Sequence, residues 1–246
     1  RYNMEVKIVE NYQEMSRLAA ILLAAEVIEN PHTILGLATG STPVGLYKEL
    51  ITMYQNGKLD FSDVKTFNLD EYVGLAAEHE QSYHYFMKKN LFEHINMKEE
   101  NIHIPRGDAA DISEEALRYE QEIQKTGKIQ LQLLGLGENG HIGFNEPADS
   151  FSVQTGEIVL ADSTIEANQR FFERREDVPK TAISIGIGTI MNAEKILLVA
   201  CGEKKAKAVK SVVEGRVTPH VPGSILQFHP HVTVIADRAA TALLKK

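Results

Sequence analysis

One short segment of the chain combines the residue types that acid–base chemistry needs. In residues 133–147 an apolar run breaks into glycines and is followed by Asn139, His141, Asn145 and Glu146. Such a run is typical of a buried parallel strand, and ligands of open α/β sheets bind beyond the carboxyl ends of the strands. A histidine beside a carboxylate can move protons near neutral pH. We interpret this segment as the floor of an active site; a buried, hydrogen-bonded histidine is the structural alternative.

A second segment, residues 37–43, has the composition of a phosphate-binding loop. Gly40 permits a tight turn, and Thr39, Ser41 and Thr42 supply hydroxyl groups directly before a predicted helix. The N-terminus of a helix favours phosphate through its free N–H groups and its dipole. The segment lacks the Lys-Ser/Thr ending of a Walker loop and the spacing of a dinucleotide fingerprint, so nucleotide binding is not indicated. A helix cap with a turn glycine is the alternative.

Two adjacent carboxylates, Asp70 and Glu71, follow a third strand-like run. Their side chains should diverge, so that one faces a substrate and the other makes structural contacts. A carboxylate in this position can act as a base toward a carbon acid. Taken alone, this segment favours capping of the next helix over a catalytic role, because aspartate is a preferred N-cap residue.

Two cations complete the candidate site. Lys205 lies in the first turn of a predicted helix, where a cation is unfavourable against the helix dipole unless an anion binds between them. Arg170 lies in the sequence Ala-Asn-Gln-Arg-Phe-Phe. Their neighbours Arg174, Arg175 and Lys204 are expected to be solvated surface charges.

Elements of two kinds alternate along the chain and would position these residues. Strands are predicted at residues 4–9, 33–37, 64–69, 130–136, 196–200 and 232–235, and helices at 11–28, 43–55, 82–94, 113–125, 203–214 and 238–244. This alternation indicates βαβ units, and therefore an α/β fold with a mostly parallel sheet and helices on both faces. Right-handed crossovers would place successive strand ends along one edge.

The chain is expected to form a single domain over residues 1–246. Residues 147–180 are the least regular part, polar and rich in charge. They form either a lid over the site or an ordinary surface excursion.

Composition excludes several functional classes. The 246 residues carry a formal charge of −8 without a basic stripe, so we expect no nucleic-acid partner. No apolar run approaches the ~20 residues that span a bilayer, so we expect no membrane insertion. The lone Cys201 cannot form an internal disulfide, which suits a reducing cytoplasm. His229 and His231 lack an evident third ligand, and no metal site is predicted.

Several motifs together resemble the glucosamine-6-phosphate deaminase (isomerising) family. They occur in the order of that family and run through almost the whole chain, at residues 35–43, 68–74, 82–83, 137–147, 167–172 and 178–182. The resemblance implies a Rossmann-like sheet, no metal and no organic cofactor. It also implies conversion of an amino-sugar phosphate, glucosamine 6-phosphate, and water to fructose 6-phosphate and ammonia.

The resemblance also assigns roles by position. Asp70 matches the base that moves the C2 proton to C1, and His141 matches the residue that opens the sugar ring, supported by Asn139 and Glu146. The residues that match the phosphate site are Thr39, Gly40, Ser41, Thr42, Arg170 and Lys205.

Two departures from the family pattern affect these expectations. Many members carry aspartate at the position of Asn139, and an amide can orient His141 but cannot hold a negative charge. The proton relay should then depend more on Glu146. Ser41 replaces a glycine common in the phosphate loop.

Two rival functions share parts of this pattern. A 6-phosphogluconolactonase shares the general fold but breaks no C–H bond, so residues 68–72 and 144–146 fit the deaminase better. A non-catalytic sugar-phosphate sensor would not need Asp70 or His141. The sequence leaves open whether the protein is a monomer or a homo-oligomer.

Overall fold

The fold was analysed in a computed structural model that describes residues 2–245. The strands are β1 (Glu5–Val9), β2 (Ile34–Leu37), β3 (Lys65–Asn68), β4 (Asp70–Tyr72), β5 (Ile102–His103), β6 (Leu131–Leu134), β7 (Gly156–Val159), β8 (Thr181–Ser184), β9 (Lys195–Ala200) and β10 (Val232–Asp237). The α-helices are α1 (Tyr12–Glu29), α2 (Val44–Gln55), α3 (Tyr83–Asn90), α4 (Ile112–Thr126), α5 (Asp162–Asn168), α6 (Ile187–Met191) and α7 (Ala206–Glu214). Short 3-10 helices cover Phe92–His94, Glu99–Asn101, Gln169–Phe171, Arg175–Asp177, Glu203–Lys205 and Pro222–Phe228.

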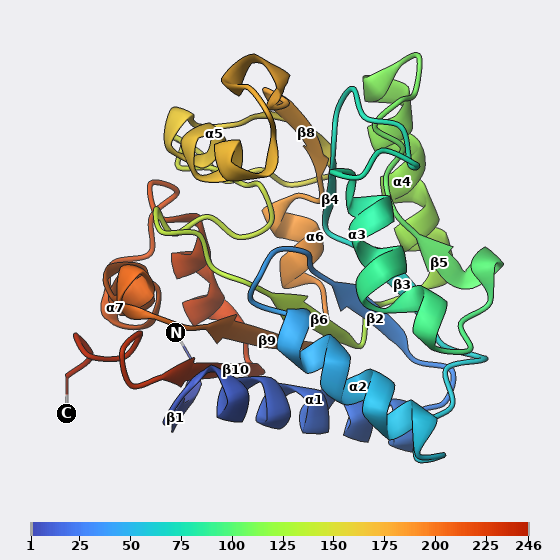
Figure 1. The fold of residues 1–246 in the computed structure, drawn as a ribbon. Helices are drawn as coiled ribbons and strands as arrows, with labels where there is room; N and C mark the ends of the chain where they lie inside the picture. Colours follow the sequence, from blue (N-terminus) through green and yellow to red (C-terminus); the bar gives the residue numbers. More distant parts are fainter. Residues whose placement is uncertain (1, 246) are drawn as a thin grey trace.

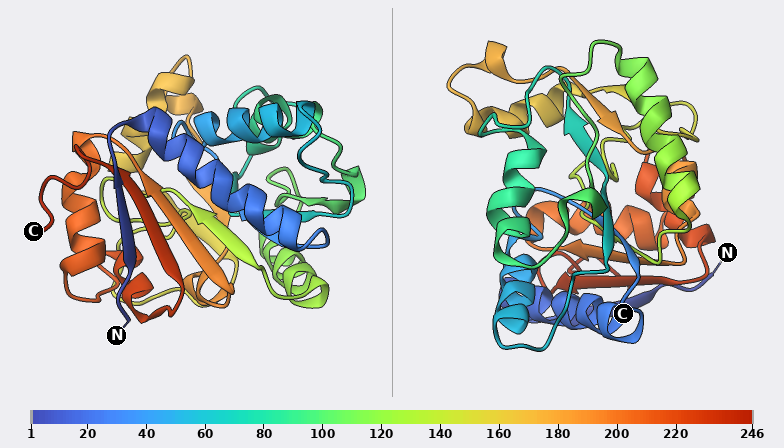
Figure 2. Two further views of the ribbon diagram at one scale, coloured as in Figure 1. Left: turned by 90° about the horizontal axis from the view of Figure 1, so that it is seen from below. Right: turned by 90° about the vertical axis from the view of Figure 1, so that its right-hand side faces the viewer.

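Seven strands form one parallel sheet in the order β1-β10-β9-β6-β2-β3-β5. All four residues of β2 and of β6 are buried, as expected for central strands covered on both faces. In Figure 1 helix α1 lies below this sheet and α6 lies above it, and the view from below in Figure 2 shows α1 crossing the strands. The predicted α/β fold is confirmed.

The order of the strands reverses between β2 and β6. From β2 the chain proceeds outward through β3 to β5, then returns to β6 and proceeds through β9 and β10 in the opposite direction. Loops that leave two such strands diverge to opposite faces, and the crevice between them is the usual ligand site of an open α/β sheet.

A second, three-stranded antiparallel sheet was not predicted from the sequence. It has the order β4-β8-β7 and places Asp70 opposite Ser184. Figure 1 shows β4 and β8 with α5 above the seven-stranded sheet. A small core that includes the buried Tyr72, Phe144 and Leu160 packs around this sheet.

The helix predicted at residues 238–244 is wrong, because these residues form turns. The carboxylate of Asp237 accepts hydrogen bonds from the N–H groups of Ala240 and Gly202, at 2.9 and 3.0 Å. The Thr241 hydroxyl donates to the carbonyl of Asp237 at 2.9 Å. These bonds close a compact turn at the end of β10, and a seven-residue segment is too short to sustain a helix without strong packing.

None of the helices described between residues 2 and 245 is long and apolar enough to span a membrane.

The position of β4 depends on a close approach of the backbone at Gly107. A Cβ atom added there would lie 1.9 Å from the carbonyl oxygen of Tyr72. We therefore expect Gly107→Ala to lower the free energy of unfolding by about 1–3 kcal/mol. Urea unfolding measures this change, with Gly156→Ala as the control, because a Cβ there meets only one atom, at 4.0 Å. Equal stability of the two variants would contradict the tight packing at Gly107.

Candidate active site

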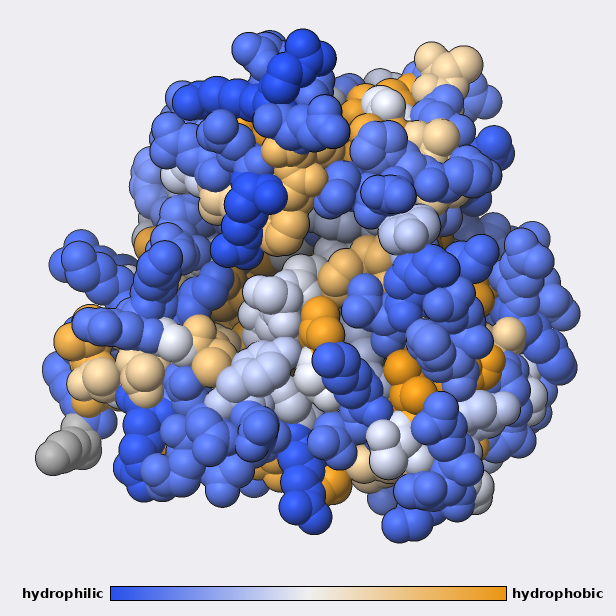
Figure 3. All heavy atoms as spheres, in the orientation of Figure 1, coloured by the Kyte–Doolittle hydropathy of each residue, from blue (hydrophilic) through white to orange (hydrophobic). Residues whose placement is uncertain are grey.

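Four loops at the carboxyl edge of the parallel sheet carry the residues singled out in the sequence, except Arg170, which lies in the 3-10 helix Gln169–Phe171 after α5. The loop after β2 carries residues 39–42, and the loop after β6 carries residues 137–146, so these two flank the point where the strand order reverses. Asp70 follows β3, the neighbour of β2, and Lys205 follows β9, the neighbour of β6. In Figure 3 the middle of the molecular face is hollowed and coloured pale to orange, with hydrophilic residues around it.

His141 is held in one orientation by two side chains. Its Nδ1 lies 2.7 Å from Oδ1 of Asn139 and 3.5 Å from Oε2 of Glu146. Both partners are acceptors, so Nδ1 carries a proton and, in neutral imidazole, Nε2 keeps a lone pair. The ring lies against Gly137, where an added Cβ would come within 2.3 Å of it. His141 is thus positioned to exchange a proton through Nε2.

Glu146 is a charged member of this group and is kept ionised by its neighbours. Burial raises the pKa of its carboxyl. Hydrogen bonds from His141, Thr164 and Asn139 lower this pKa by more than burial raises it, so the pKa lies below its ordinary value. Asn139 donates to Oε2 at 2.8 Å, and Thr164 donates to Oε1 at 2.6 Å. Asn139 therefore connects His141 to Glu146 although it carries no charge itself.

Asp70 lies in a nearly dry environment beside the same loop. Its residue is 6 % exposed, and its Oδ2 would be 3.8 Å from a Cβ added at Gly143. Burial, and then the charge of the adjacent Glu71, raise the pKa of Asp70 to about 8. A carboxyl group with this pKa can both accept and return a proton near neutral pH.

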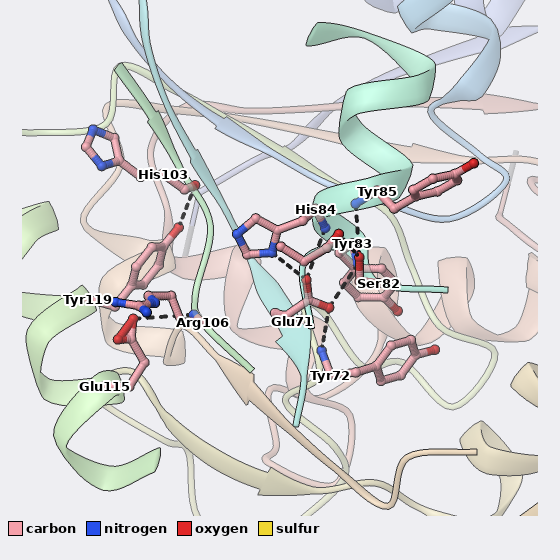
Figure 4. A network of polar contacts seen from close by, with 11 residues as sticks. Glu71, Tyr72, Ser82, Tyr83, His84, Tyr85, His103, Arg106, Glu115 and Tyr119 are labelled. Atoms are coloured by element: carbon pink, nitrogen blue, oxygen red, sulfur yellow. Dashed lines mark hydrogen bonds and ion pairs between the residues drawn. The ribbon is translucent and has the colours of Figure 1, made fainter. Parts of the chain in front are cut away.

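Glu71 points away from this position, into a network at the start of α3 (Figure 4). Its carboxylate accepts hydrogen bonds from the backbone N–H groups of Tyr72 and Tyr83, each at 2.9 Å. The predicted divergence of the two carboxylates agrees with this arrangement, in which Glu71 makes structural contacts.

The loop after β2 is fixed by a tyrosine from α1. The Tyr12 hydroxyl donates to the carbonyl oxygens of Ser41 and Thr42 at 3.0 Å, and it accepts the N–H of Gly45 at 2.9 Å. Gly40 has φ +94°, a left-handed conformation that favours glycine. Thr39 is near enough to Tyr83 to lower the pKa of the tyrosine hydroxyl, against the larger effect of burial, which raises it.

The two predicted cations lie close enough to influence each other. Burial lowers the pKa of Lys205; the charge of Arg170 lowers it as well, and that of Glu138 opposes the shift. The Lys205 ammonium donates to the carbonyl oxygen of Leu136 at 2.6 Å, which joins the loops after β9 and β6. Among residues 2–245 neither Lys205 nor Arg170 forms an ion pair with a carboxylate.

Sequence reasoning gave no role to three residues of this site. Thr164, from α5, donates to Glu146, and Tyr83 lies near Thr39 of the loop after β2. Asn145 donates to the carbonyls of Ile142 and Ile185, at 3.0 and 2.8 Å, and so braces the glycine-rich loop. These contacts join distant segments, and no local sequence pattern predicts them.

His229 and His231 do not form a metal site. Nε2 of His229 donates to the carbonyl of Ala193 at 2.7 Å, and its Nδ1 accepts the N–H of His231 at 3.0 Å. Across the described part of the chain, no three His, Cys, Asp or Glu side chains gather as a metal site requires.

Comparison with known proteins agrees with this geometry. A family model described as glucosamine-6-phosphate isomerases/6-phosphogluconolactonase matches residues 10–235. The chain belongs to this family. The glucosamine-6-phosphate deaminase of Thermoanaerobacter pseudethanolicus is 54% identical over 241 residues, which cover 98% of this chain and 95% of that protein. The deaminase of Halothermothrix orenii is 53% identical, with 98% and 100% covered.

Solved structures place the chain within the same family. A monomeric glucosamine-6-phosphate deaminase superposes with a TM-score of 0.95 at 43% identity, covering 98% of this chain and 100% of that one. The 6-phosphogluconolactonase of Leishmania guyanensis has a TM-score of 0.77 at 20% identity and covers both chains fully, which shows a shared fold.

The burial of Asp70 predicts a stability that depends on pH. In the unfolded chain this carboxyl has its ordinary pKa of 3.8, and in the folded protein the pKa is about 8. The folded form therefore retains a proton that the unfolded chain releases, so the contribution of Asp70 to stability is largest below pH 4 and is lost as the pH rises through 8.

Because Asp70→Asn carries no charge, we expect this variant to melt above the unsubstituted protein by roughly 2–6 °C at pH 9, with a smaller difference at pH 5. Differential scanning calorimetry measures both differences, with Asp108→Asn as an exposed control. A difference that does not grow between pH 5 and pH 9 would contradict the raised pKa.

Proposed function

We propose that this chain is a glucosamine-6-phosphate deaminase that converts glucosamine 6-phosphate and water to fructose 6-phosphate and ammonia. The single observation that carries this proposal is the placement of a buried basic carboxylate, Asp70, beside the oriented pair of His141 and Glu146. A proton donor for a ring oxygen and a base for a C–H bond thus meet in one crevice. The high identity to curated deaminases over the whole chain supports the same reaction.

Opening of the sugar ring comes first, because only the open-chain aldehyde makes the C2 proton acidic. We assign proton exchange with the ring oxygen and the anomeric hydroxyl to Nε2 of His141. Glu146 stabilises the charged imidazole through its contact with Nδ1, which Asn139 shares. General acid–base catalysis of this kind is typically worth 10²–10⁴-fold.

Transfer of the C2 proton follows, and we assign it to Asp70. Removal of that proton gives an enolamine, and return of a proton to C1 gives a ketose imine. Water adds to the imine and ammonia leaves, so one fructose 6-phosphate and one ammonia form per turnover. The raised pKa of Asp70 supports this role, because the same group must accept and then release a proton.

The phosphate is chemically inert in this reaction and serves to hold the substrate. We assign its binding to the hydroxyl-rich loop at residues 39–42 and to Arg170 and Lys205. Two cations without carboxylate partners within the described residues support an anionic ligand. The cytoplasmic location and the absence of a cofactor, both expected from the sequence, stay predictions, as does movement of residues 147–180 as a lid.

Ammonia and fructose 6-phosphate formed from glucosamine 6-phosphate test the proposed reaction. We expect equal amounts of both products, and Asp70→Asn should lower kcat at least about a hundredfold. Circular dichroism of the variant serves as the control for folding. Near-normal turnover by Asp70→Asn would remove Asp70 from its role, and release of product from 6-phosphogluconolactone alone would contradict the proposed substrate.

Phosphate binding by Lys205 is tested separately. Lys205→Ala should raise KM roughly tenfold or more and change kcat less, because the group contacts an unreactive part of the substrate. Lys204→Ala is the matched control on an exposed neighbour. A fall in kcat at unchanged KM would argue against a phosphate contact.

A further inference from the structure

The carboxylate of Glu71 is fully buried and has four hydrogen-bond donors (Figure 4). Oε1 accepts the N–H groups of Tyr72 and Tyr83, each at 2.9 Å. Oε2 accepts the N–H of His84 at 3.0 Å and lies 2.8 Å from Nδ1 of the same histidine. These four donors are arranged to compensate the negative charge of one carboxylate.

Capping of α3 accounts for only part of this arrangement. Glu71 accepts the first-turn N–H groups of Tyr83 and His84, and the Ser82 hydroxyl accepts that of Tyr85 at 3.0 Å. The contact with Nδ1 of His84 is additional to these capping bonds. His84 supplies the one side-chain donor to Glu71 among the described residues, and its side chain is 28% exposed. The other three donors are backbone N–H groups, so the His84 ring is the donor that a substitution can remove.

Glu71 is adjacent to Asp70 in a strand, so the two side chains point to opposite faces while their charges remain close. The ladder with β8 fixes both residues, with Asp70 opposite Ser184 and Glu71 opposite Ile183. The charge of Glu71 raises the pKa of Asp70, in addition to the larger effect of burial.

We propose that Glu71 and His84 form a positioning pair that acts through Asp70. Glu71 holds a negative charge next to the base, and the hydrogen bond from His84 sets how strongly that charge repels a charge on Asp70. This inference rests on the proposed function, since it concerns the group to which C2 deprotonation is assigned. Neither residue of the pair is placed in contact with the substrate.

Other charged or titratable groups surround the pair and stay the same in the experiment below. They come from β4, α3, β5, the loop before α4 and α4 itself: Asp70, Tyr72, Tyr83, Tyr85, His103, Arg106, Glu115 and Tyr119. Glu115 is itself ion-paired with Arg118.

The pair predicts opposite effects for its two members. Removal of the Glu71 charge lowers the pKa of Asp70, because the repulsion that resists ionisation is lost. Removal of His84 takes a donor from Glu71, leaves its charge less compensated and raises the pKa of Asp70. A merely structural role would disturb both variants without this reversal of sign.

The experiment follows the titration of Asp70 in protein labelled with ¹³C at aspartate carboxyl groups, with the Asp70 signal assigned by its loss in Asp70→Asn. We expect Glu71→Gln to lower the titration midpoint by about one pH unit and His84→Phe to raise it by about half a unit. The acidic limb of the kcat profile should move in the same directions. Because NMR needs no turnover, a failure of the deaminase assay leaves this test intact.

Two further variants make the outcome specific. His84→Asn places an amide N–H where Nδ1 lies, so it should restore the midpoint to within about 0.3 pH unit of the unsubstituted protein. His94→Phe removes an exposed histidine and should leave it unchanged. If Glu71→Gln fails to fold, the difference between the Asp70 midpoints of His84→Phe and His84→Asn tests the proposal by itself. Equal midpoints for these two variants, or shifts of the same sign for Glu71→Gln and His84→Phe, would overturn the proposal.

Discussion

Burial of the Asp70 carboxyl is the interaction on which the rest of this site depends. A carboxylate in water is too weak a base to take a proton from carbon efficiently, whereas desolvation raises its pKa to about 8. Burial of a charge costs stability, so the surrounding structure must impose it. The second sheet does this, because β4 is held by β8 and backed by the close approach of Gly107 to Tyr72.

The parallel sheet brings together groups that are far apart in the sequence. The reversal of strand order between β2 and β6 opens a crevice into which four loops project. A short contact joins two of these loops, because the Lys205 ammonium donates to the carbonyl of Leu136.

The sequence predicted six of the seven parallel strands, because buried strands such as β2 and β6 appear as short, largely apolar runs bounded by turns. It did not predict β4, β5, β7 and β8, since two to four residues paired across distant segments leave no periodicity to detect. The loops after β2, β3, β6 and β9, which carry most of the candidate residues, do leave the same edge of the sheet. Their supporting partners, Thr164 and His84, were missed because only the three-dimensional arrangement brings them to Glu146 and Glu71.

Transfer of the C2 proton is the step that we assign to Asp70, and it can be followed with glucosamine 6-phosphate deuterated at C2. Mass spectrometry of the recovered substrate and of fructose 6-phosphate measures loss of deuterium from C2 and its appearance at C1. If Asp70 is the base, the unsubstituted protein removes deuterium from C2 during turnover, and Asp70→Asn leaves it in place while still binding the substrate. Removal of deuterium by Asp70→Asn at the rate of the unsubstituted protein would show that another group is the base.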